Sequence, residues 1–347
     1  MAAQARAIAA PTPWKLAFTN WKELGVPIAV LGVVIALITP LPGAMLDVLI
    51  VTDIMMSVVV MMVSMYIRKP VEFSVFPTTL LLLTLFRLAL SISATRLILM
   101  NGNGGTSAAG DVIQAFGNFV VGGNYIIGTV IFLVLIAIQY VVINHGAVRI
   151  SEVTARFTLD ALPGKQMSID SDLNSGLIDE NEARKRRKEL AREAEFYGAM
   201  DGASRFTQRD AVAAILITGI NIIAIPDRRA ATRHGPEQGT ATYTVLTIGD
   251  GLVTVIPALM ISISGGLIVT RASSDDRLGT DFAKQLFGSS QPLFLASGVV
   301  IVLSIFPGLP TVPFLVLGSG HGLRSLENAC KAGLRREVRR DRQAGGC

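Results

Sequence analysis

The sequence is poor in charged and aromatic residues. Charged side chains make up 16% of its 347 residues, whereas soluble globular domains carry about 25%. Apolar residues make up 51%, which excludes an ordinary soluble domain and indicates a membrane protein. Aromatic residues are only 6%, while glycines number 33, a composition typical of helices that pack through small residues. The ten-residue alternation of an outer-membrane barrel is absent, so we expect an all-α fold.

Residues that could carry catalytic or metal chemistry are also scarce. Cys330 and Cys347 are the two cysteines, and both lie in the tail, so the chain has no disulfide framework. The three histidines are scattered: His145, His234 and His321. This leaves no cluster with metal-ligand spacing and no pairing of a nucleophile with a base. We therefore expect no enzyme activity, no metal, no cofactor and no nucleic-acid partner.

Long apolar runs are what the chain does have. A bilayer core needs about 20 apolar residues per helix. The first run starts near Val26 and continues without a cleavage site, so it is not a signal peptide. We predict an all-α polytopic membrane protein with seven to eight transmembrane helices and a cytoplasmic helical loop between the fourth and fifth. The predicted spans are 26–42, 46–66, 75–100, 123–143, 211–226, 246–270, 291–306 and a short, weak 308–319.

Basic residues predict the orientation of these spans. The polar segment 144–209 contains eleven Lys and Arg residues, whereas the loops 43–46 and 101–122 contain none. Loops rich in Lys and Arg stay in the cytoplasm. Only 227–245, with three arginines, breaks the pattern. The N-terminus and 144–209 are therefore predicted to be cytoplasmic.

The chain divides into four parts on this basis. Residues 1–143 hold the first four spans, 144–209 form the cytoplasmic loop, and 210–319 hold the remaining spans. Residues 320–347 form a basic tail.

The segment 144–209 has signals of its own helices. Pro163-Gly164 and Asn174-Ser-Gly176 are turn signals. Asp179 with Glu182 has the form of a helix cap, and we expect the helix after it to end near Gly198. Its basic run, 184–188, is predicted to be a solvated helix face. Lys165 lacks the glycine spacing of a phosphate loop, which argues against a nucleotide site.

Three stretches of this segment carry a family resemblance. Residues 156–178 read RFTLDALPGKQMSIDSDLNSGLI, 182–187 read EARKRR, and 195–206 read EFYGAMDGASRF. They resemble the signature loop of the flagella/hypersensitive-response/invasion protein export pore family. The resemblance covers about residues 20 to 318. Within the loop, it points to seven residues: Arg149, Arg156, Asp160, Pro163, Gly164, Lys165 and Asp201.

The resemblance implies a function that composition cannot show. Members of this family are inner-membrane components of the bacterial type III protein export gate, and couple the proton motive force to export of unfolded flagellar subunits. They form a homononameric ring beside other export-gate membrane proteins and the basal-body ring. A large soluble C-terminal domain docks the export ATPase complex, chaperones and subunits. Residues 122–125 and 157–161 favour a flagellar member over the equivalent gate of a non-flagellar type III system, which stays an alternative.

Arg87 lies near the middle of the third predicted span. A charge inside a bilayer is unfavourable, so it is a functional candidate by default. Asp47 and Asp53 on the second span are possible partners. A structural Arg–Asp pair and a coupling role stay equally open. Helical spacing places four polar residues on one face that should contact protein or water: Thr84, Arg87, Ser91 and Thr95.

Arg96 is nine residues beyond Arg87 and on the opposite helix face. It is close enough to the outer end of the span for its long side chain to reach the interface. Spacing alone favours a structural role for Arg96, although the family pattern includes both arginines.

Two aspartates complete the ion-coupling candidates. Asp210 begins the fifth span, where it is either a helix N-cap or a carboxylate that binds and releases a proton or cation. The resemblance implies the second role, with a basic partner that is usually Lys but here is Arg205, which can favour the charged form of a nearby aspartate. Asp250 lies between Gly249 and Gly251, which can loosen the helix. It is either an interfacial residue or, as the resemblance implies, a coupling residue.

An ion-coupled small-solute transporter is the rival function. Such a transporter would show inverted sequence repeats, and the halves of this chain show none. The resemblance is expected to stop near Gly318, beyond which the family's large cytoplasmic domain is absent. A frameshift or truncation is the first explanation, and a deliberately shortened chain or a split gene are the others.

Overall fold

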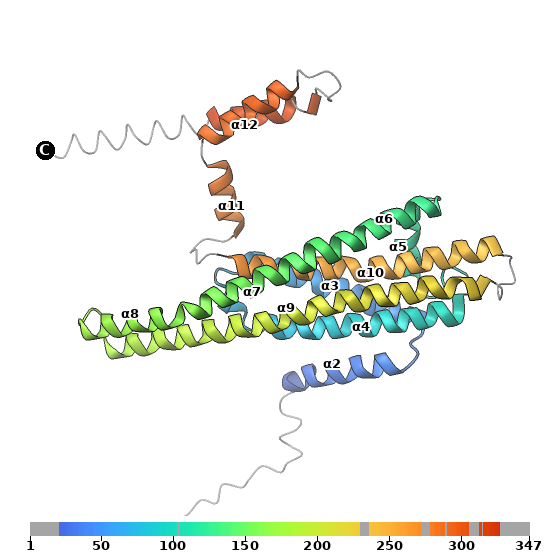
Figure 1. The fold of residues 1–347 in the computed structure, drawn as a ribbon, viewed down its shortest axis with the longest axis horizontal. Helices are drawn as coiled ribbons and strands as arrows, with labels where there is room; N and C mark the ends of the chain where they lie inside the picture. The colour runs from blue at the N-terminus through green and yellow to red at the C-terminus, as the bar shows by residue number, and fades with distance from the viewer. Residues whose placement is uncertain are drawn as a thin grey trace, which may run out of the picture. The chain divides into compact units, whose positions relative to one another are not determined.

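The computed structural model describes residues 21–102, 105–229, 236–271, 278–288, 290–304, 312–313 and 315–326. These residues form helices and no strand (Figure 1). The first half of the chain holds α2 (Trp21–Ile38), α3 (Gly43–Tyr66), the short η1 (Pro70–Phe73), α4 (Phe76–Asn101), α5 (Asp111–Val121) and α6 (Tyr125–Ile138). A π-helix, η3 (Gln139–Asn144), joins α6 to α7 (His145–Asp160). Then follow α8 (Leu162–Asn174), α9 (Glu180–Arg229), α10 (Pro236–Thr270), α11 (Leu278–Phe287) and α12 (Ser290–Leu303).

The chain forms two compact units. The first comprises Met1–Ser64 and Pro70–Arg271, and therefore α2 to α10 apart from the end of α3. The second comprises Met65–Lys69 and Ala272–Cys347, with α11 and α12. All the candidate residues of the sequence lie in the first unit.

The protein is an all-α polytopic membrane protein. Five helical stretches of the described chain are long and apolar enough to cross a membrane: Gly43–Tyr66, Phe76–Asn101, Tyr125–Asn174, Glu180–Ile223 and Ala241–Thr270. They overlap the second to sixth predicted spans, with ends that differ by up to three residues where a predicted span extends beyond the stretch. The first and seventh correspond to shorter apolar helices, Leu24–Ile38 and Ser290–Leu303. Part of the eighth, 308–319, lies outside the described residues.

The first unit is built around α4 and α10, the most buried of these helices. One core cluster joins α3, α4 and α10 to the middle of α9, through side chains that include Phe76, Tyr197 and Ile261. A second joins α3 and α4 to α5 and α10, around Leu46, Ile98 and Leu246. Helix α9 is 50 residues long, or about 75 Å at 1.5 Å per residue. It lies beside α4 over part of its length and beside α7 and α8 over another (Figure 1).

Helix α5 is an element that the sequence analysis placed in a loop. It is amphipathic, and its buried face packs on α10 with Ile113 and Gly117. Its first turn is held from α3, because the backbone N–H groups of Asp111 and Val112 donate to the Asp47 carboxylate at 2.9 and 3.0 Å. Asp47 therefore caps α5 and is not a partner of Arg87.

Glycines make the contact between α5 and α10 possible. A Cβ added to Gly249 would lie 2.1 Å from the backbone oxygen of Ile113, and one added to Gly117 would lie 2.3 Å from that of Val245. A Cβ on Gly251 would meet the Phe132 ring at 2.3 Å. The expectation that Gly249 and Gly251 loosen the helix is wrong, since α10 is continuous here and both glycines allow close packing.

The sequence signals in the α8–α9 hairpin predict where α9 begins but not where it ends. The Asp179 cap is confirmed, because its Oδ1 accepts from the Glu182 N–H at 2.8 Å. The turn before it is also present, with Gly176 at a φ of +74°, a conformation that favours glycine. The predicted end near Gly198 is wrong, because α9 continues to Arg229. Its side chains after Gly198 enter the first core cluster, and that burial outweighs the helix penalty of glycine, about 1 kcal/mol.

The basic run is only partly a solvated face. Arg184 and Lys185 pair with acids of their own helix, Glu180 at 2.8 Å and Glu182 at 4.0 Å. Arg186 pairs both with Glu182 of its own helix, at 3.3 Å, and with Asp172 of α8, and Arg187 binds Asp170 of α8. Because these pairs are a third to a half exposed, each contributes about 1 kcal/mol or less. These pairs therefore add little to the stability of the hairpin, and their main effect is to align α8 with α9.

Candidate functional site

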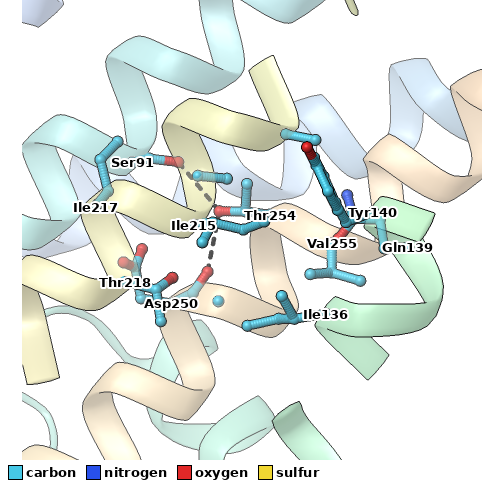
Figure 2. A pocket seen from close by; sticks show the side chains of 13 residues that line it. Ser91, Ile136, Gln139, Tyr140, Ile215, Ile217, Thr218, Asp250, Thr254 and Val255 are labelled. Carbon is cyan, nitrogen blue, oxygen red and sulfur yellow. Dashed lines mark hydrogen bonds between the residues drawn. The ribbon is translucent and has the colours of Figure 1, made fainter. Parts of the chain in front are cut away.

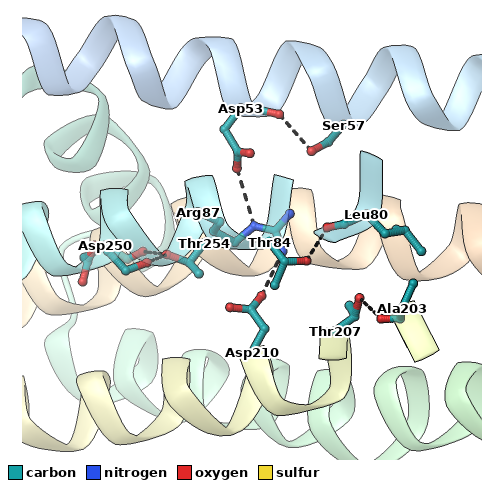
Figure 3. Close-up of polar contacts among 11 residues, drawn as sticks. Asp53, Ser57, Leu80, Thr84, Arg87, Ala203, Thr207, Asp210, Asp250 and Thr254 are labelled. Atoms are coloured by element: carbon teal, nitrogen blue, oxygen red, sulfur yellow. Dashed lines mark hydrogen bonds and ion pairs between the residues drawn. The ribbon is translucent and has the colours of Figure 1, made fainter. Parts of the chain in front are cut away.

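Arg87 lies between two carboxylates inside the helix bundle. Its Nη1 is 3.2 Å from Oδ2 of Asp210 on α9, and its Nε is 3.5 Å from Oδ2 of Asp53 on α3 (Figure 3). Arg87 is 1% exposed, and the two aspartates are 3% and 5% exposed. One guanidinium thus joins two neighbouring helices, α3 and α4, to α9, whose Asp210 lies 123 positions after Arg87.

The polar face of α4 explains how Arg87 reaches this position. Thr84, Arg87 and Ser91 are all buried, as their spacing predicts. The Thr84 hydroxyl donates to its own helix, at the Leu80 carbonyl oxygen (2.7 Å), which leaves Arg87 to bind the neighbouring helices. Thr95 continues this face toward the end of the helix.

The charges of this cluster do not balance. Two carboxylates face one guanidinium, so the cluster carries one excess negative charge when both acids are ionised. Within the described chain, no hydrogen-bond partner faces the second oxygen of either acid or Nη2 of Arg87. A buried charge without a partner is strongly unfavourable. Uptake of one proton would make the cluster neutral.

Asp250 forms a second buried site. It lies within α10, is 5% exposed, and accepts a hydrogen bond from Nδ2 of Asn221 on α9 at 3.4 Å. The same Nδ2 lies 3.2 Å from the Thr95 hydroxyl on α4. No Lys or Arg of the described residues forms an ion pair with Asp250. Asp250 is therefore an interior carboxylate and not a residue of an outer loop.

A small cavity lies beside Asp250. Its walls include Ser91, Gln139, Tyr140 and Thr254 (Figure 2). The space open to the centre of a water molecule is about 20 Å³, and about 10–15 Å³ is enough for one water. Gln139 and Tyr140 come from the π-helix η3, a rare helix form that is frequent at functional sites.

The other two ion-coupling candidates lie apart from these sites. Arg96 donates from Nη1 to the backbone oxygen of Ile38 at 2.9 Å and so caps the end of α2. Arg205 is half-exposed and pairs with Asp201 at 3.2 Å and Glu152 at 3.9 Å. The basic partner of Asp210 is thus Arg87 and not Arg205. Arg205 is five residues before Asp210 on the same helix, and side chains at that spacing do not lie on the same helix face.

Comparison with known proteins identifies the family. The sequence model of the FHIPEP family matches residues 33–344. The chain belongs to the FHIPEP family. Since the match runs to residue 344, the expectation that the resemblance stops near Gly318 is wrong.

Curated relatives within this family carry flagellar names. The chain is 48% identical over 310 residues to flagellar biosynthesis protein FlhA of Escherichia coli (strain K12), covering 89% of this chain and 45% of the relative. It is 48% identical over 322 residues to FlhA of Salmonella typhimurium (strain LT2), covering 91% of this chain and 46% of the relative. It is 45% identical over 305 residues to the putative flagellar export/assembly protein LfhA of Escherichia coli O44:H18 (strain 042 / EAEC), covering 88% and 44%.

The chain spans about half the length of the curated relatives it matches and corresponds to their N-terminal part. No solved structure matches the chain.

The signature loop of this FHIPEP chain lies on α7, α8 and the first half of α9. Lys165 of α8 binds Glu193 of α9 at 3.1 Å, and Arg149 of α7 binds Glu152 at 3.1 Å. Pro163 and Gly164 lie in the first turn of α8 and Asp201 in the middle of α9. Arg156 and Asp160 are exposed on α7. None of these side chains is among those that contact Arg87 or Asp250, so the loop and the buried carboxylates are separate features.

Three site residues were missed from the sequence: Asn221, Thr254 and Gln139. Asn221 is the one amide within the predicted span 211–226, and polar residues inside apolar spans mark interior faces. That signal was available. Thr254 is one helical turn after Asp250, but a threonine usually bonds only its own helix. Gln139 lines the cavity from the π-helix, and no pattern in the sequence predicts a π-helix at this position. Among the described residues, no group of three or more acids, histidines or cysteines could hold a metal ion.

Proposed function

We propose that this protein is a membrane component of a bacterial flagellar protein export apparatus. Membership of the FHIPEP family and the flagellar names of the relatives support this proposal. Its role is to couple the proton motive force to the export of flagellar subunits, by gating and ion binding rather than by catalysis.

The observation that carries the coupling role is the buried Asp53–Arg87–Asp210 cluster. Arginine stays charged at any working pH, so it cannot release a proton itself. The excess carboxylate can take up a proton and give it away again. Because Asp53, Arg87 and Asp210 belong to α3, α4 and α9, a change in their charge balance alters the attraction between three helices. Proton binding is thereby linked to helix movement.

The setting of the protein is part of the same proposal. The surplus of Lys and Arg in 144–209 supports an inner-membrane protein whose N-terminus and segment 144–209 face the cytoplasm. We further propose a homo-oligomeric ring beside the other export-gate proteins and the basal-body ring. Contacts with the export ATPase complex, chaperones and subunits are proposed to lie mostly in the C-terminal region of the relatives, which this chain does not cover.

Substitution in the gene of the host bacterium tests the proposal. Asp210→Asn keeps the shape of the side chain and removes its charge, so we expect loss of swimming in soft agar and of subunit secretion at normal protein level. The matched control is Asp111→Asn, at an exposed acid in the first turn of α5. Wild-type swimming and secretion in the Asp210→Asn strain would contradict the proposal.

A further inference from the structure

The two buried carboxylate sites lie on one face of α4. Ser91 follows Arg87 by one helical turn and points to α10, where its hydroxyl oxygen is 3.1 Å from that of Thr254. Thr254 lies one turn after Asp250, and its hydroxyl is 3.0 Å from the Asp250 backbone oxygen. Figure 2 shows the line from Ser91 through Thr254 to Asp250.

Ser91 differs from other buried hydroxyls of the same helix. Thr84 donates to a backbone carbonyl of its own helix. Ser93, on a different face of α4, donates to the Ala36 carbonyl of α2 at 2.9 Å. Such bonds satisfy a buried hydroxyl and need no further explanation. Ser91 instead meets a second hydroxyl, and either oxygen of that pair can be the donor. Because Thr254 donates its own proton to the Asp250 backbone carbonyl oxygen at 3.0 Å, Ser91 is the donor of the pair in this structure. Rotation of the Thr254 hydroxyl away from that carbonyl would let Thr254 donate to Ser91 instead.

Two small cavities connect the sites through this pair. One is lined by Asp53, Arg87, Ser91, Asp250 and Thr254, with about 10 Å³ open to the centre of a water molecule. The larger cavity beside Asp250 is also lined by Ser91 and Thr254. Ser91, Thr254 and Asp250 thus line both spaces. The Thr254 hydroxyl binds the backbone of Asp250 and not its carboxylate, so a water molecule in each cavity is needed to complete a path between the two sites. About 10–15 Å³ is enough for one water.

We propose that Ser91 and Thr254 form a hydroxyl bridge that passes protons between Asp250 and the Asp53–Arg87–Asp210 cluster. The inference rests on the proposed coupling function and adds two positioning residues to it. A hydroxyl is both a donor and an acceptor. As its oxygen gains a proton from one side, it releases its own proton to the other, so one O–H bond forms while another breaks. After the transfer each hydroxyl again carries one proton, and only the direction of the hydrogen bonds has reversed.

Proton flux through the full chain in proteoliposomes tests the bridge. A potassium gradient with valinomycin drives proton entry, which a trapped pH dye reports. Thr254→Val keeps the shape of the side chain but removes the hydroxyl, and leaves no space for a replacing water. We expect it to lower the flux by about 100-fold, the lower range for loss of a positioned proton-transfer group. Thr254→Ser restores the hydroxyl and should restore most of the flux.

A second substitution and a control separate this effect from misfolding. Ser91→Cys keeps nearly the same volume and replaces the hydroxyl by a weakly bonding thiol, so it should also lower the flux. If Thr254→Val cannot be recovered as folded protein, the flux of Ser91→Cys tests the bridge in its place. Ser93→Ala removes a buried hydroxyl of the same helix that lies outside the bridge, and we expect wild-type flux.

The outcomes distinguish the bridge from the coupling function itself. Loss of flux in Asp210→Asn and Asp250→Asn with wild-type flux in Thr254→Val and Ser91→Cys would overturn the bridge and leave the proposed function standing. Wild-type flux in both aspartate variants, or no flux through the wild-type chain, would overturn both. If either Ser93→Ala or Thr254→Ser lowered the flux as much as Thr254→Val does, the loss would be a packing effect. That result would also overturn the bridge.

Discussion

The charge count of the Arg87 cluster predicts an unusual stability series. Asp53→Asn and Asp210→Asn each leave one carboxylate for one guanidinium, and the new amide oxygen can still accept from Arg87. We expect each single substitution to change the free energy of unfolding by about 1 kcal/mol or less, because the excess charge is what it removes. The double substitution leaves Arg87, which is 1% exposed, with neutral amides and no carboxylate to balance its charge. Breaking a buried pair in this way costs about 3–5 kcal/mol.

The double variant should therefore be less stable than the sum of the two single variants by about 2 kcal/mol. The assay is unfolding in bicelles by steric trapping, with wild type, both single variants and the double variant measured under the same conditions. The pair Glu180–Arg184 is a suitable control, because its side chains are 70% and 73% exposed, and its cycle should give about 0.5 kcal/mol or less. Additive effects at Asp53 and Asp210 would refute the view that both acids hold one guanidinium.

Three further predictions concern the scaffold around these sites. Gly249→Ala places a Cβ against a backbone oxygen of α5 and should destabilise the protein by about 1–3 kcal/mol. In the control Gly266→Ala, on the same helix, the added Cβ meets open space and stability should not fall. Equal unfolding midpoints for the two variants would contradict the close contact. Asp47→Ala removes the cap of α5, costing about 1–2 kcal/mol, and should speed amide exchange in α5 but not in α9. Asp179→Ala, at the start of α9, should cost about 1 kcal/mol and speed exchange only in the first turn of that helix, so exchange spreading to residues near Asp210 would be the unexpected result.

Much of the fold follows from the sequence because long apolar runs in a bilayer leave few alternatives to a helix. The second to sixth spans are found in this way. Helix α5 was missed because it is an 11-residue amphipathic helix in a segment without basic residues, and its buried face is defined by α10, more than a hundred residues later. The false helix end near Gly198 has the same origin, since core packing along α9 overrides a local glycine signal.

The site was predictable in its members but not in its pairings. Arg87, Asp210 and Asp250 stand out as charges within or at the edge of apolar spans, and Asp53 was one of two named partners. Choosing Asp53 over Asp47 requires the position of α5, which binds Asp47. The link from Arg87 to Asp210 joins residues 123 positions apart, so no local spacing reveals it. The family resemblance implies Arg205 as the basic partner of Asp210, whereas in the structure its side chain pairs with Asp201.

The central claim is that buried carboxylates of this protein take up and release protons. Infrared difference spectra of the chain in lipid bilayers, recorded between high and low pH, report directly on carboxyl protonation. We expect a protonated-carboxyl band that shifts in D₂O, loses intensity in Asp210→Asn and in Asp250→Asn, and is unchanged in intensity by removal of the exposed carboxylate in Asp111→Asn. Identical spectra for the wild type and both buried aspartate variants would contradict the account.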